Sequence, residues 1–573
     1  MNTPRTGEFV IPISYESTEI IETGNWSSLK PQTANLTAPC REHCPVGTDI
    51  PGFIDLVQRG HYEKALEAIV LENPLPGVCG RVCHHPCESA CNRSQWDESV
   101  SIRALERFVA SRAKMPKMPF SPSCPSSSRK IAIVGSGPAG LACAYFLALL
   151  GHCAVIYEEK SEPGGVLRWG IPQFRLPVQI LKRDLKRIFP LPIELKTGCR
   201  VGRDIALNDL MGFDAIFLSP GAERSAPLSV AGENLAGVWA GVEFLKKIRA
   251  GAKMSPGKET LVIGGGNTAI DVARTASRLG SRVTVAYRRT RAAMLAVPEE
   301  IQEAEEEGIQ FEFLVQPVKI ERVLDERLAV TFQRMESAGL DSANRPAVFP
   351  VAGEFMTLIA DTVIAAVGER VDLTWVPKEM VKNGHIVPEF NSRIFAGGDA
   401  VLQPRTVVSA IASGKKAAIL IDAIFCGMDK TRVLSKIQIG SRGSLSMKAY
   451  LAGKERGNWS ERPKIITAQE INPLYIEFSR RQKDKKVGPI ARLKNFSEVN
   501  LTMGASQARR AAARCHSCGV CNFCGSCYYF CPEGVITIDP GDGLRTVDFA
   551  HCKGCGVCMR SCLRGALRME DSP

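Results

Sequence analysis

The stretch Lys130 to Gly165 constrains the fold of this chain more than any other part of the sequence. A short apolar run leads directly into the turn Gly135-Ser-Gly137-Pro-Ala-Gly140. A helix-length apolar segment follows, and then a second apolar run that ends at Glu158. This order predicts a strand, a glycine-rich turn, a helix and a strand, which together form the βαβ unit that binds a dinucleotide.

The residues of this unit have separate predicted roles. Gly135 forms the tight turn, Gly137 lets backbone amides approach a pyrophosphate, and Gly140 lets the helix pack closely on the strand. The helix starts directly after Gly137, so its positive N-terminus faces the phosphates. Glu158 lies 18 residues beyond the last glycine and is placed to accept a hydrogen bond from an adenosine ribose hydroxyl.

A second unit of the same kind runs from Leu261 to Arg289, but it ends in Arg288-Arg289 where the first unit has an acid. A carboxylate suits a ribose 2′-hydroxyl, whereas arginines suit a 2′-phosphate. We therefore assign FAD to the first unit and a nicotinamide dinucleotide to the second, NADPH in preference to NADH. Arginines that stack on adenine or face solvent are the alternative. The predicted FAD contacts of the first unit are Gly135, Gly137, Pro138, Ala139, Gly140 and Glu158, and the predicted NAD(P)H contacts are Gly264, Gly266, Asn267, Thr268, Ala269, Arg288 and Arg289.

The 21 cysteines fall mainly into two groups, six between Cys40 and Cys91 and ten between Cys515 and Cys562. Spacings of two or three residues are typical of metal ligands, and so many reduced thiols indicate a cytoplasmic protein. The first group indicates an iron–sulfur site. Zinc is the alternative, although structural zinc sites prefer CxxC pairs. The first group consists of Cys40, Cys44, Cys79, Cys83, Cys87 and Cys91.

The second group contains two CxxCxxCxxxC runs, the pattern of a bacterial two-cluster ferredoxin. In this pattern the fourth cysteine of each run binds the cluster of the other run. Cys515 and Cys518 extend the group upstream, and we interpret them as spare thiols close to a cluster. The predicted ligands of one 4Fe–4S cluster are Cys521, Cys524, Cys527 and Cys562, and those of the other are Cys531, Cys552, Cys555 and Cys558.

The first cysteine group, the GPAG turn and the segment after Gly164 together resemble the glutamate synthase small-subunit family, which includes dihydropyrimidine dehydrogenase. The resemblance implies an N-terminal helical domain with eight cysteines and two 4Fe–4S clusters. The two earliest cysteine positions are Gln32 and Asn35 here, so the cluster shared with Cys40 and Cys91 lacks two ligands. One N-terminal cluster is therefore expected, and a second one is left open.

The same resemblance assigns the ligands of the expected N-terminal cluster. Cys44, Cys83 and Cys87 would bind it, and the fourth ligand would be Glu106, with Cys79 as the competing candidate. A surface acid on a helix is the plain alternative for Glu106. Further flavin contacts are implied at the GGxLR turn, where Arg168 would reach a phosphate or stay at the surface, and at the GGD element and the helix after it. These contacts are Gly164, Gly165, Arg168, Gly398, Asp399, Thr406 and Val407.

The predicted fold is multidomain, because 573 residues exceed one hydrophobic core. We expect an N-terminal α-helical Fe–S domain, two Rossmann-like α/β domains with the NAD(P) domain inserted in the FAD domain, and a C-terminal 2×(4Fe–4S) ferredoxin domain. The apolar run at 361–368 is expected to return the chain to the FAD domain. The predicted boundaries are 1–128, 129–250 with 360–428 for FAD, 251–359 for NAD(P)H, 429–512 for a basic linker, and 513–573 for the ferredoxin domain.

The charge distribution and the hydropathy of the sequence limit the classes of partner that we expect. Between Asp429 and Arg510, 18 Lys and Arg residues stand against 7 Asp and Glu residues, so the linker carries most of the net charge of +12. It would dock an acidic protein or serve as a solvated connector. Nucleic acid is not expected, because aromatic residues do not interleave with these charges. No run of 18 apolar residues and no secretory signal is found, so a membrane span is not expected.

These parts predict an NAD(P)H:acceptor oxidoreductase in which FAD and 4Fe–4S clusters carry the chemistry, so no catalytic side chain is assigned. The expected acceptor is a protein, either ferredoxin or a partner reductase such as dissimilatory sulfite reductase, and the direction of electron flow is left open. One alternative is the electron-input subunit of a glutamate synthase. A non-catalytic Fe–S scaffold or carrier is the alternative from another class, and a homodimer is left open.

Overall fold

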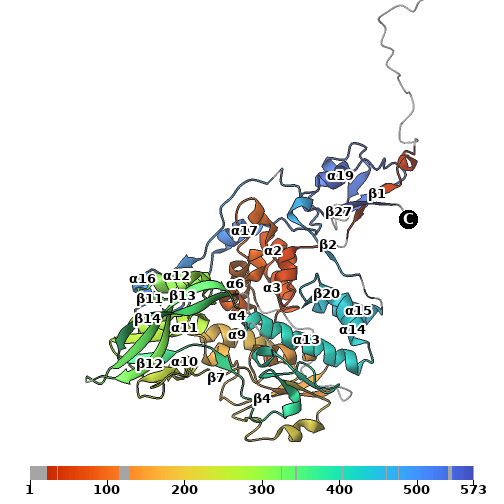
Figure 1. Cartoon of the computed structure of the whole chain (residues 1–573). Coiled ribbons are helices and arrows are strands. Elements are labelled where there is room, and N and C mark those ends of the chain that lie inside the picture. Colours follow the sequence, from red (N-terminus) through yellow and green to blue (C-terminus); the bar gives the residue numbers. More distant parts are fainter. Residues whose placement is uncertain are drawn as a thin grey trace, which may run out of the picture.

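The computed structural model describes residues 22–34, 36–114, 129–323, 325–341, 345–401, 405–457, 459, 461–474, 476–539 and 545–571. Asn35 and residues 115–128, which end at the predicted boundary between the first two domains, lie outside these residues. In Figure 1 the N-terminal helices occupy the centre, the two α/β regions lie below and to the left, and the C-terminal cysteine-rich region lies at the upper right. Within the described ranges, no helix is long and apolar enough to cross a membrane.

The N-terminal region is a small bundle of helices around a shared apolar core. Asp49 caps one of them by accepting a hydrogen bond from the Gly52 amide at 3.3 Å, and Pro51 occupies its first turn. Phe53, Ile54 and Val57 are then all buried on one face. The helices are α1 (Pro39–His43), α2 (Ile50–Gln58), α3 (Tyr62–Val70), α4 (Pro76–Val82), α5 (Pro86–Ser89) and α6 (Ile102–Arg112).

The first dinucleotide unit lies in a parallel sheet of five strands, ordered β19-β6-β3-β4-β5. Helix α7 (Pro138–Leu149) is buried along its whole length because it lies between this sheet and α13 (Val407–Phe425). Each fully buried Leu or Phe of such a helix contributes about 1.5–3 kcal/mol of hydrophobic stabilisation. The strands are β3 (Lys130–Val134), β4 (Cys153–Glu158), β5 (Ile193–Thr197), β6 (Ala215–Leu218) and β19 (Ile394–Ala396).

The second dinucleotide unit forms another parallel sheet of five strands, ordered β11-β10-β9-β15-β8. Here the structure corrects the predicted boundaries. Strand β15 was expected to return the chain to the FAD domain, but it pairs with β9 and β8, and the return comes only at β19. A four-residue apolar run fits the centre of either sheet, so its sequence does not distinguish them. The strands are β8 (Val238–Ala240), β9 (Glu259–Ile263), β10 (Arg282–Tyr287), β11 (Gln310–Phe313) and β15 (Thr362–Ala365), and α11 (Asn267–Arg278) follows β9.

A three-stranded antiparallel sheet, ordered β12-β13-β14, is attached to the second domain. Its inner residues Val330 and Phe332 are fully buried against the parallel sheet, whereas its far end carries the exposed side chains of Phe349 and Phe355. The strands are β12 (Val315–Arg322), β13 (Leu328–Leu340) and β14 (Pro346–Ala360).

The basic segment 429–512 is folded over the other domains and contains α14 (Lys430–Ile437), α15 (Met447–Arg456) and α17 (Ala505–Ala513). Many of its charges pair with acids of the same chain. Lys486 lies 2.7 Å from Glu303, and Arg492 lies 2.8 Å from Glu306, both on α12 (Pro298–Glu306). Part of the positive charge that could attract an acidic partner is therefore neutralised by acids of the same chain.

The C-terminal region is completed by a strand from the other end of the chain. Strand β1 (Leu29–Thr33) pairs antiparallel with β27 (Leu567–Asp571), and Gln32 stands opposite Arg568. Residues 29–33, which the predicted boundaries place in the N-terminal domain, therefore form a strand of the cysteine-rich region. The other elements of this region are β25 (Ile536–Ile538), β26 (Arg545–Val547), α18 (Ser526–Tyr529) and α19 (Val557–Arg560). The predicted fold class, with a helical region, two Rossmann-like sheets and a cysteine-rich end, is confirmed.

Candidate functional site

A cavity of about 510 Å³ is lined by residues from the carboxyl ends of strands in both parallel sheets. Gly137 belongs to the first fingerprint turn, Thr268 belongs to the second, and both line this cavity. Val82 and His84, from the N-terminal cysteine segment, line it as well. The two dinucleotide units and the helical region therefore share one cavity.

Both fingerprint turns lie where the strand order of their sheet reverses, the usual ligand position in such sheets. Gly135 has a φ of 94°, and a Cβ at this position would lie 2.4 Å from the Ser219 carbonyl oxygen. Gly264 has a φ of 146°, and its Cβ would lie 2.2 Å from the Ala366 carbonyl oxygen. Each turn therefore requires glycine at its first position, because backbone from the neighbouring strand passes close to it.

The middle glycines are different, because they face open space. A Cβ at Gly137 or at Gly266 would have no atom within 4 Å. In contrast, a Cβ at Gly140 would lie only 1.9 Å from the Gly135 carbonyl oxygen. The space beside Gly137 and Gly266 fits the pyrophosphate of a dinucleotide at the N-termini of α7 and α11. Gly140 has a packing role instead.

Glu158 lines the cavity at the end of β4 and is buried. One carboxylate oxygen accepts hydrogen bonds from the Ser136 amide, at 2.9 Å, and from the Ser136 hydroxyl. The other accepts from the Lys160 amide at 2.8 Å. Because each carboxylate oxygen has further lone-pair capacity, Glu158 can still accept from a ribose hydroxyl.

The flavin-side loops predicted from the sequence reach the same cavity, with one exception. Gly165, Asp399 and Thr406 line it, and the Thr406 hydroxyl caps α13 by accepting from the Ser409 amide at 3.2 Å. Burial raises the pKa of Asp399 to about 6. Gly398 and Val407 line the cavity beside these residues, and Gly164 lies in the turn before it, where its amide donates to the Ser136 carbonyl at 3.1 Å.

Arg168 is the exception. Its guanidinium pairs with Glu162 at 2.6 Å and lies over the Trp169 ring, 4.3 Å from the centroid. It is not among the residues that line the cavity. The structure therefore does not favour a phosphate contact, because a bidentate carboxylate partner in the same turn holds this arginine, and with 14% of its side chain exposed it is not a plain surface residue either.

The two arginines that directly follow β10, Arg288 and Arg289, have different surroundings. Arg289 is buried, pairs with Asp341 at 2.8 Å and donates to the Pro346 carbonyl at 2.9 Å. Its side chain is thus held at the end of the antiparallel sheet, and it is not among the residues that line the cavity. Arg288 is exposed at the strand end. The structure thus leaves one of the two predicted arginines for a 2′-phosphate.

Some cavity residues were missed by the sequence analysis. The Glu369 carboxylate accepts from the Thr268 hydroxyl at 2.8 Å, and the Arg405 guanidinium donates to the Glu369 carbonyl. Arg405 also donates to the Asp399 carbonyl at 3.2 Å. These contacts connect the second fingerprint turn with the GGD element. No local motif marks Glu369 or Arg405, so the sequence held no signal for them.

In the N-terminal region, Cys44, Cys79, Cys83 and Cys87 lie close together with Glu106 of α6. Burial is the main cause of the raised pKa of each thiol, and the neighbouring Glu106 charge also raises those of Cys44, Cys79 and Cys83. Burial raises the pKa of Glu106 to about 8, and its carboxylate accepts from the Asn73 side-chain amide at 2.8 Å. The Glu106 side chain is partly buried and lies beside these thiols, which disfavours the surface-acid alternative, and both it and Cys79 remain candidates for a fourth ligand.

The C-terminal cysteines form two separate cavities. The first is lined by Cys521, Cys524, Cys527 and Cys562, and the second by Cys531, Cys552, Cys555 and Cys558. In each set, three cysteines come from one run and one comes from the other run. This is the crossed arrangement of a two-cluster ferredoxin, so the residues fit two 4Fe–4S clusters.

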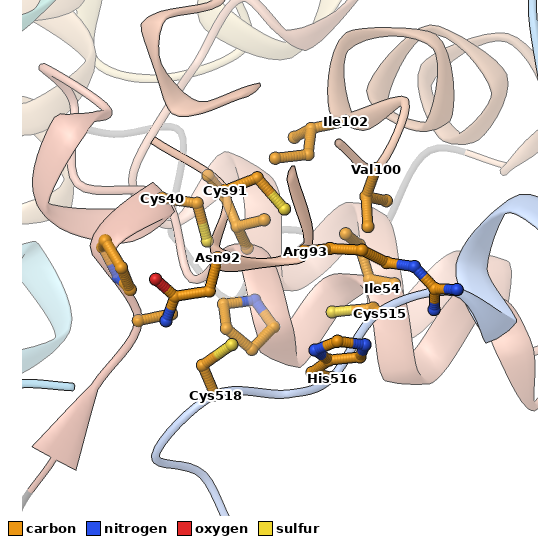
Figure 2. Close-up of a pocket in the computed structure, with 14 residues that line it drawn as sticks. Cys40, Ile54, Cys91, Asn92, Arg93, Val100, Ile102, Cys515, His516 and Cys518 are labelled. Carbon is orange, nitrogen blue, oxygen red and sulfur yellow. The ribbon is translucent and has the colours of Figure 1, made fainter. Parts of the chain in front are cut away.

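Cys515 and Cys518 lie apart from these two sets. They line a further cavity together with Cys40 and Cys91 of the N-terminal region. Figure 2 shows the four sulfur atoms pointing toward one another around this cavity. The sequence analysis placed both thiols beside the ferredoxin cysteines, because their CxxC spacing continues that run. A sequence signal for their position beside Cys40 and Cys91 was nevertheless present. The family has two cysteines where this chain has Gln32 and Asn35, so two ligands had to come from another segment.

The two dinucleotide turns, their shared cavity and the cysteine sets define a flavoprotein oxidoreductase of the NAD(P)H-dependent, iron–sulfur class. Two family models agree with this class. Residues 34–118 match the model described as dihydropyrimidine dehydrogenase domain II, 4Fe-4S cluster, and residues 129–414 match the pyridine nucleotide-disulphide oxidoreductase model.

Three relatives specify the family. The NADPH-Fe(3+) oxidoreductase subunit beta of Geobacter sulfurreducens is 38% identical over 430 residues, which cover 67% of this chain and 63% of that subunit. The NADP(+)-dependent formate dehydrogenase subunit beta of Moorella thermoacetica is 35% identical, with 84% and 71% covered. The NADPH glutamate synthase small chain of Escherichia coli is 36% identical, with 66% and 87% covered. The chain belongs to the glutamate synthase small-chain-like family of FAD and NAD(P) oxidoreductases with an N-terminal 4Fe–4S domain.

Proposed function

We propose that this chain oxidises NADPH and passes the electrons one at a time to a protein acceptor. Bound FAD would accept the hydride of NADPH, and iron–sulfur clusters would carry single electrons. The observation that carries the proposal is the shared cavity, in which both fingerprint turns and His84 of the N-terminal cysteine segment lie together. The chain would bind and orient two dinucleotides there, and the transfer requires no side-chain acid or base.

The binding roles follow from the geometry. We infer that the open space at Gly137 receives the FAD pyrophosphate and that Glu158 binds its ribose. Asp399 and the N-terminus of α13 would hold the flavin end. The space at Gly266, with Asn267 and Thr268, would receive NADPH, in agreement with the NADPH or NADP(+) in the names of the three relatives.

The outlet of this path would be the ferredoxin region. Cys524 and Cys555 are exposed, as are the nearby aromatic side chains of Phe523 and Tyr529, which are 46% and 79% accessible. Exposed apolar residues around a redox site fit contact with another protein. The Geobacter and Moorella relatives are beta subunits, and we infer that this chain likewise works with a protein partner.

The proposal is tested with anaerobically purified full-length protein. NADPH is expected to bleach the flavin absorbance and then to reduce the iron–sulfur clusters, seen as an EPR signal without added dithionite. A scaffold that only carries iron would respond to dithionite but not to NADPH. Absence of FAD, or clusters that stay oxidised under excess NADPH, would exclude the proposed function.

Arg288 is expected to select NADPH. Replacing it with alanine should raise the KM for NADPH about tenfold and leave that for NADH unchanged, because a charge-assisted hydrogen bond contributes about 1.5–3 kcal/mol. Arg289→Ala is the matched control, since Arg289 is held by Asp341 away from the turn. Equal effects of Arg288→Ala on both coenzymes would show that this arginine does not contact the 2′-phosphate.

A further inference from the structure

The cavity in Figure 2 brings together four cysteines that are distant in the sequence. Cys40 comes from α1 and Cys91 from the residue before the short helix at Asn92–Gln95. Cys515 and Cys518 come from the segment that follows α17. The cavity is otherwise lined mainly by apolar side chains such as Ile54, and Cys40 and Cys518 are 8% and 9% exposed.

This set has the same composition as the two ferredoxin sets. Each of the three cavities is lined by four cysteines from segments that are far apart in the sequence, two segments in each ferredoxin set and three in this one. A zinc ion would need four sulfur atoms about 2.3 Å from one point. Among the described residues, no three Cys, His, Asp or Glu side chains are grouped to hold a single metal ion. A group that holds its four sulfurs farther apart, such as a 4Fe–4S cluster, fits the set instead.

The segment that carries Cys515 and Cys518 is held on the N-terminal region by buried ion pairs. The Arg514 guanidinium lies 2.9 Å from Asp97, and Arg93, which also pairs with Asp97 at 2.7 Å, donates to the Arg514 carbonyl at 2.6 Å. Helix α17 packs against α2 just before this point. The ion pairs of Arg514 and Arg93 with Asp97 thus hold the segment that carries the two thiols in place.

A second observation points to a bound group. His516, between the two cysteines, lines the cavity and is 7% exposed, and neither of its ring nitrogens has a hydrogen-bond partner among the described residues. Its ring packs against Trp96, with 5.1 Å between centroids. A buried imidazole without a partner is costly, and a sulfide-containing group held by the four cysteines would supply an acceptor for its N–H.

We propose that Cys40, Cys91, Cys515 and Cys518 bind a 4Fe–4S cluster that joins the N-terminal region to the ferredoxin region. Cys40 is one turn before Cys44, and Cys518 is three residues before Cys521, so this cluster lies between the N-terminal set and the first ferredoxin set. Four thiols lose their protons when the cluster binds. A cluster held by these four cysteines would carry one electron at a time from the flavin side to the ferredoxin side, so that each NADPH would require two passages. The electron-relay role rests on the proposed function, whereas the metal site itself does not.

The test compares cysteine pairs in full-length protein purified without oxygen. The double variant Cys515→Ser/Cys518→Ser should lose about four iron and four sulfide per chain. Cys40→Ser/Cys91→Ser should lose the same four, and the quadruple variant should lose no more than either double variant. Cys426→Ser, which changes an exposed cysteine outside the sets, is the matched control and should keep all its iron. Undiminished iron in the first variant, or additive losses in the quadruple variant, would overturn the proposal.

A measurement on the unmodified protein covers the case in which the variants do not fold. Cys515 and Cys518 should resist alkylation while iron is bound and react once the clusters are removed oxidatively, as mapped by mass spectrometry. Rapid alkylation of either thiol in the iron-loaded protein would contradict ligation. Dithionite reduction followed by EPR should show one cluster signal fewer in the Cys515→Ser/Cys518→Ser variant. Because neither measurement uses NADPH, failure of the metal site is distinguished from failure of the proposed function.

Discussion

Replacing Gly137 with alanine is expected to remove FAD from a protein that still folds. The Gly137 backbone has a φ of −65°, which alanine adopts readily, and a Cβ there would touch no atom of the chain. The added methyl group would instead enter the space proposed for the pyrophosphate. We expect FAD per chain to fall below about a tenth and NADPH-dependent cluster reduction to fall at least about a hundredfold, because pyrophosphate contact requires close backbone approach. Flavin absorbance and iron content measure both effects.

Two further glycine variants are matched controls for this prediction. Gly266→Ala also adds a methyl group to open space, but in the second turn, so it should retain FAD and lose reduction by NADPH. Gly140→Ala would place its Cβ 1.9 Å from the Gly135 carbonyl oxygen and should destabilise the domain itself. A Gly137→Ala protein with full FAD content would show that the cofactor does not lie against this turn.

The second large effect is expected at the ion pair between Glu72 and Lys415. Both side chains are 1% exposed, with 2.6 Å between them, and Lys415 extends from α13 to the N-terminal region. Glu72→Leu would leave the ammonium buried with the Val46 carbonyl as its remaining partner among the described residues. Breaking a buried pair in this way costs about 3–5 kcal/mol. This corresponds to a decrease of roughly 10 °C in the temperature at which FAD is released.

The double variant Glu72→Leu/Lys415→Met tests the cause. Because it removes the uncompensated charge as well, part of the lost stability should return. Full recovery is not expected, since Glu72 also accepts from the Ser446 hydroxyl and the Met447 amide, each at 2.8 Å. If Glu72→Leu and the double variant release FAD at the same temperature, the buried charge is not the cause of the loss.

The features predicted correctly from the sequence are those whose evidence lies within a short stretch. A strand, a glycine turn and a helix occur together around Gly135 and again around Gly264, so the two Rossmann-like sheets followed directly. The spacing within each C-terminal run likewise grouped the cysteines as the structure groups them around two cavities. In both cases a short motif with fixed spacing carries the evidence, even where one cysteine of each set comes from the other run.

What the sequence analysis missed depends on contacts between distant segments. The apolar run of β15 fits either sheet, and only its pairing with β8 and β9 assigns it. Arg289 has the right side chain for a phosphate, but Asp341, 52 residues further along the chain, binds it. Cys515 and Cys518 continue the spacing of the ferredoxin run, yet α17 and the Asp97 ion pairs bring them to Cys40 and Cys91.

The pairing of β1 with β27 sets the order in which this protein is assembled during synthesis. The two strands are about 540 residues apart, which corresponds to roughly 30–100 s of translation. During that interval β1 has already left the ribosome, but β27, its hydrogen-bonding partner, has not yet been made. The sheet that these two strands form can therefore close only after β27 has emerged, long after the N-terminal helices and both parallel sheets have been synthesised.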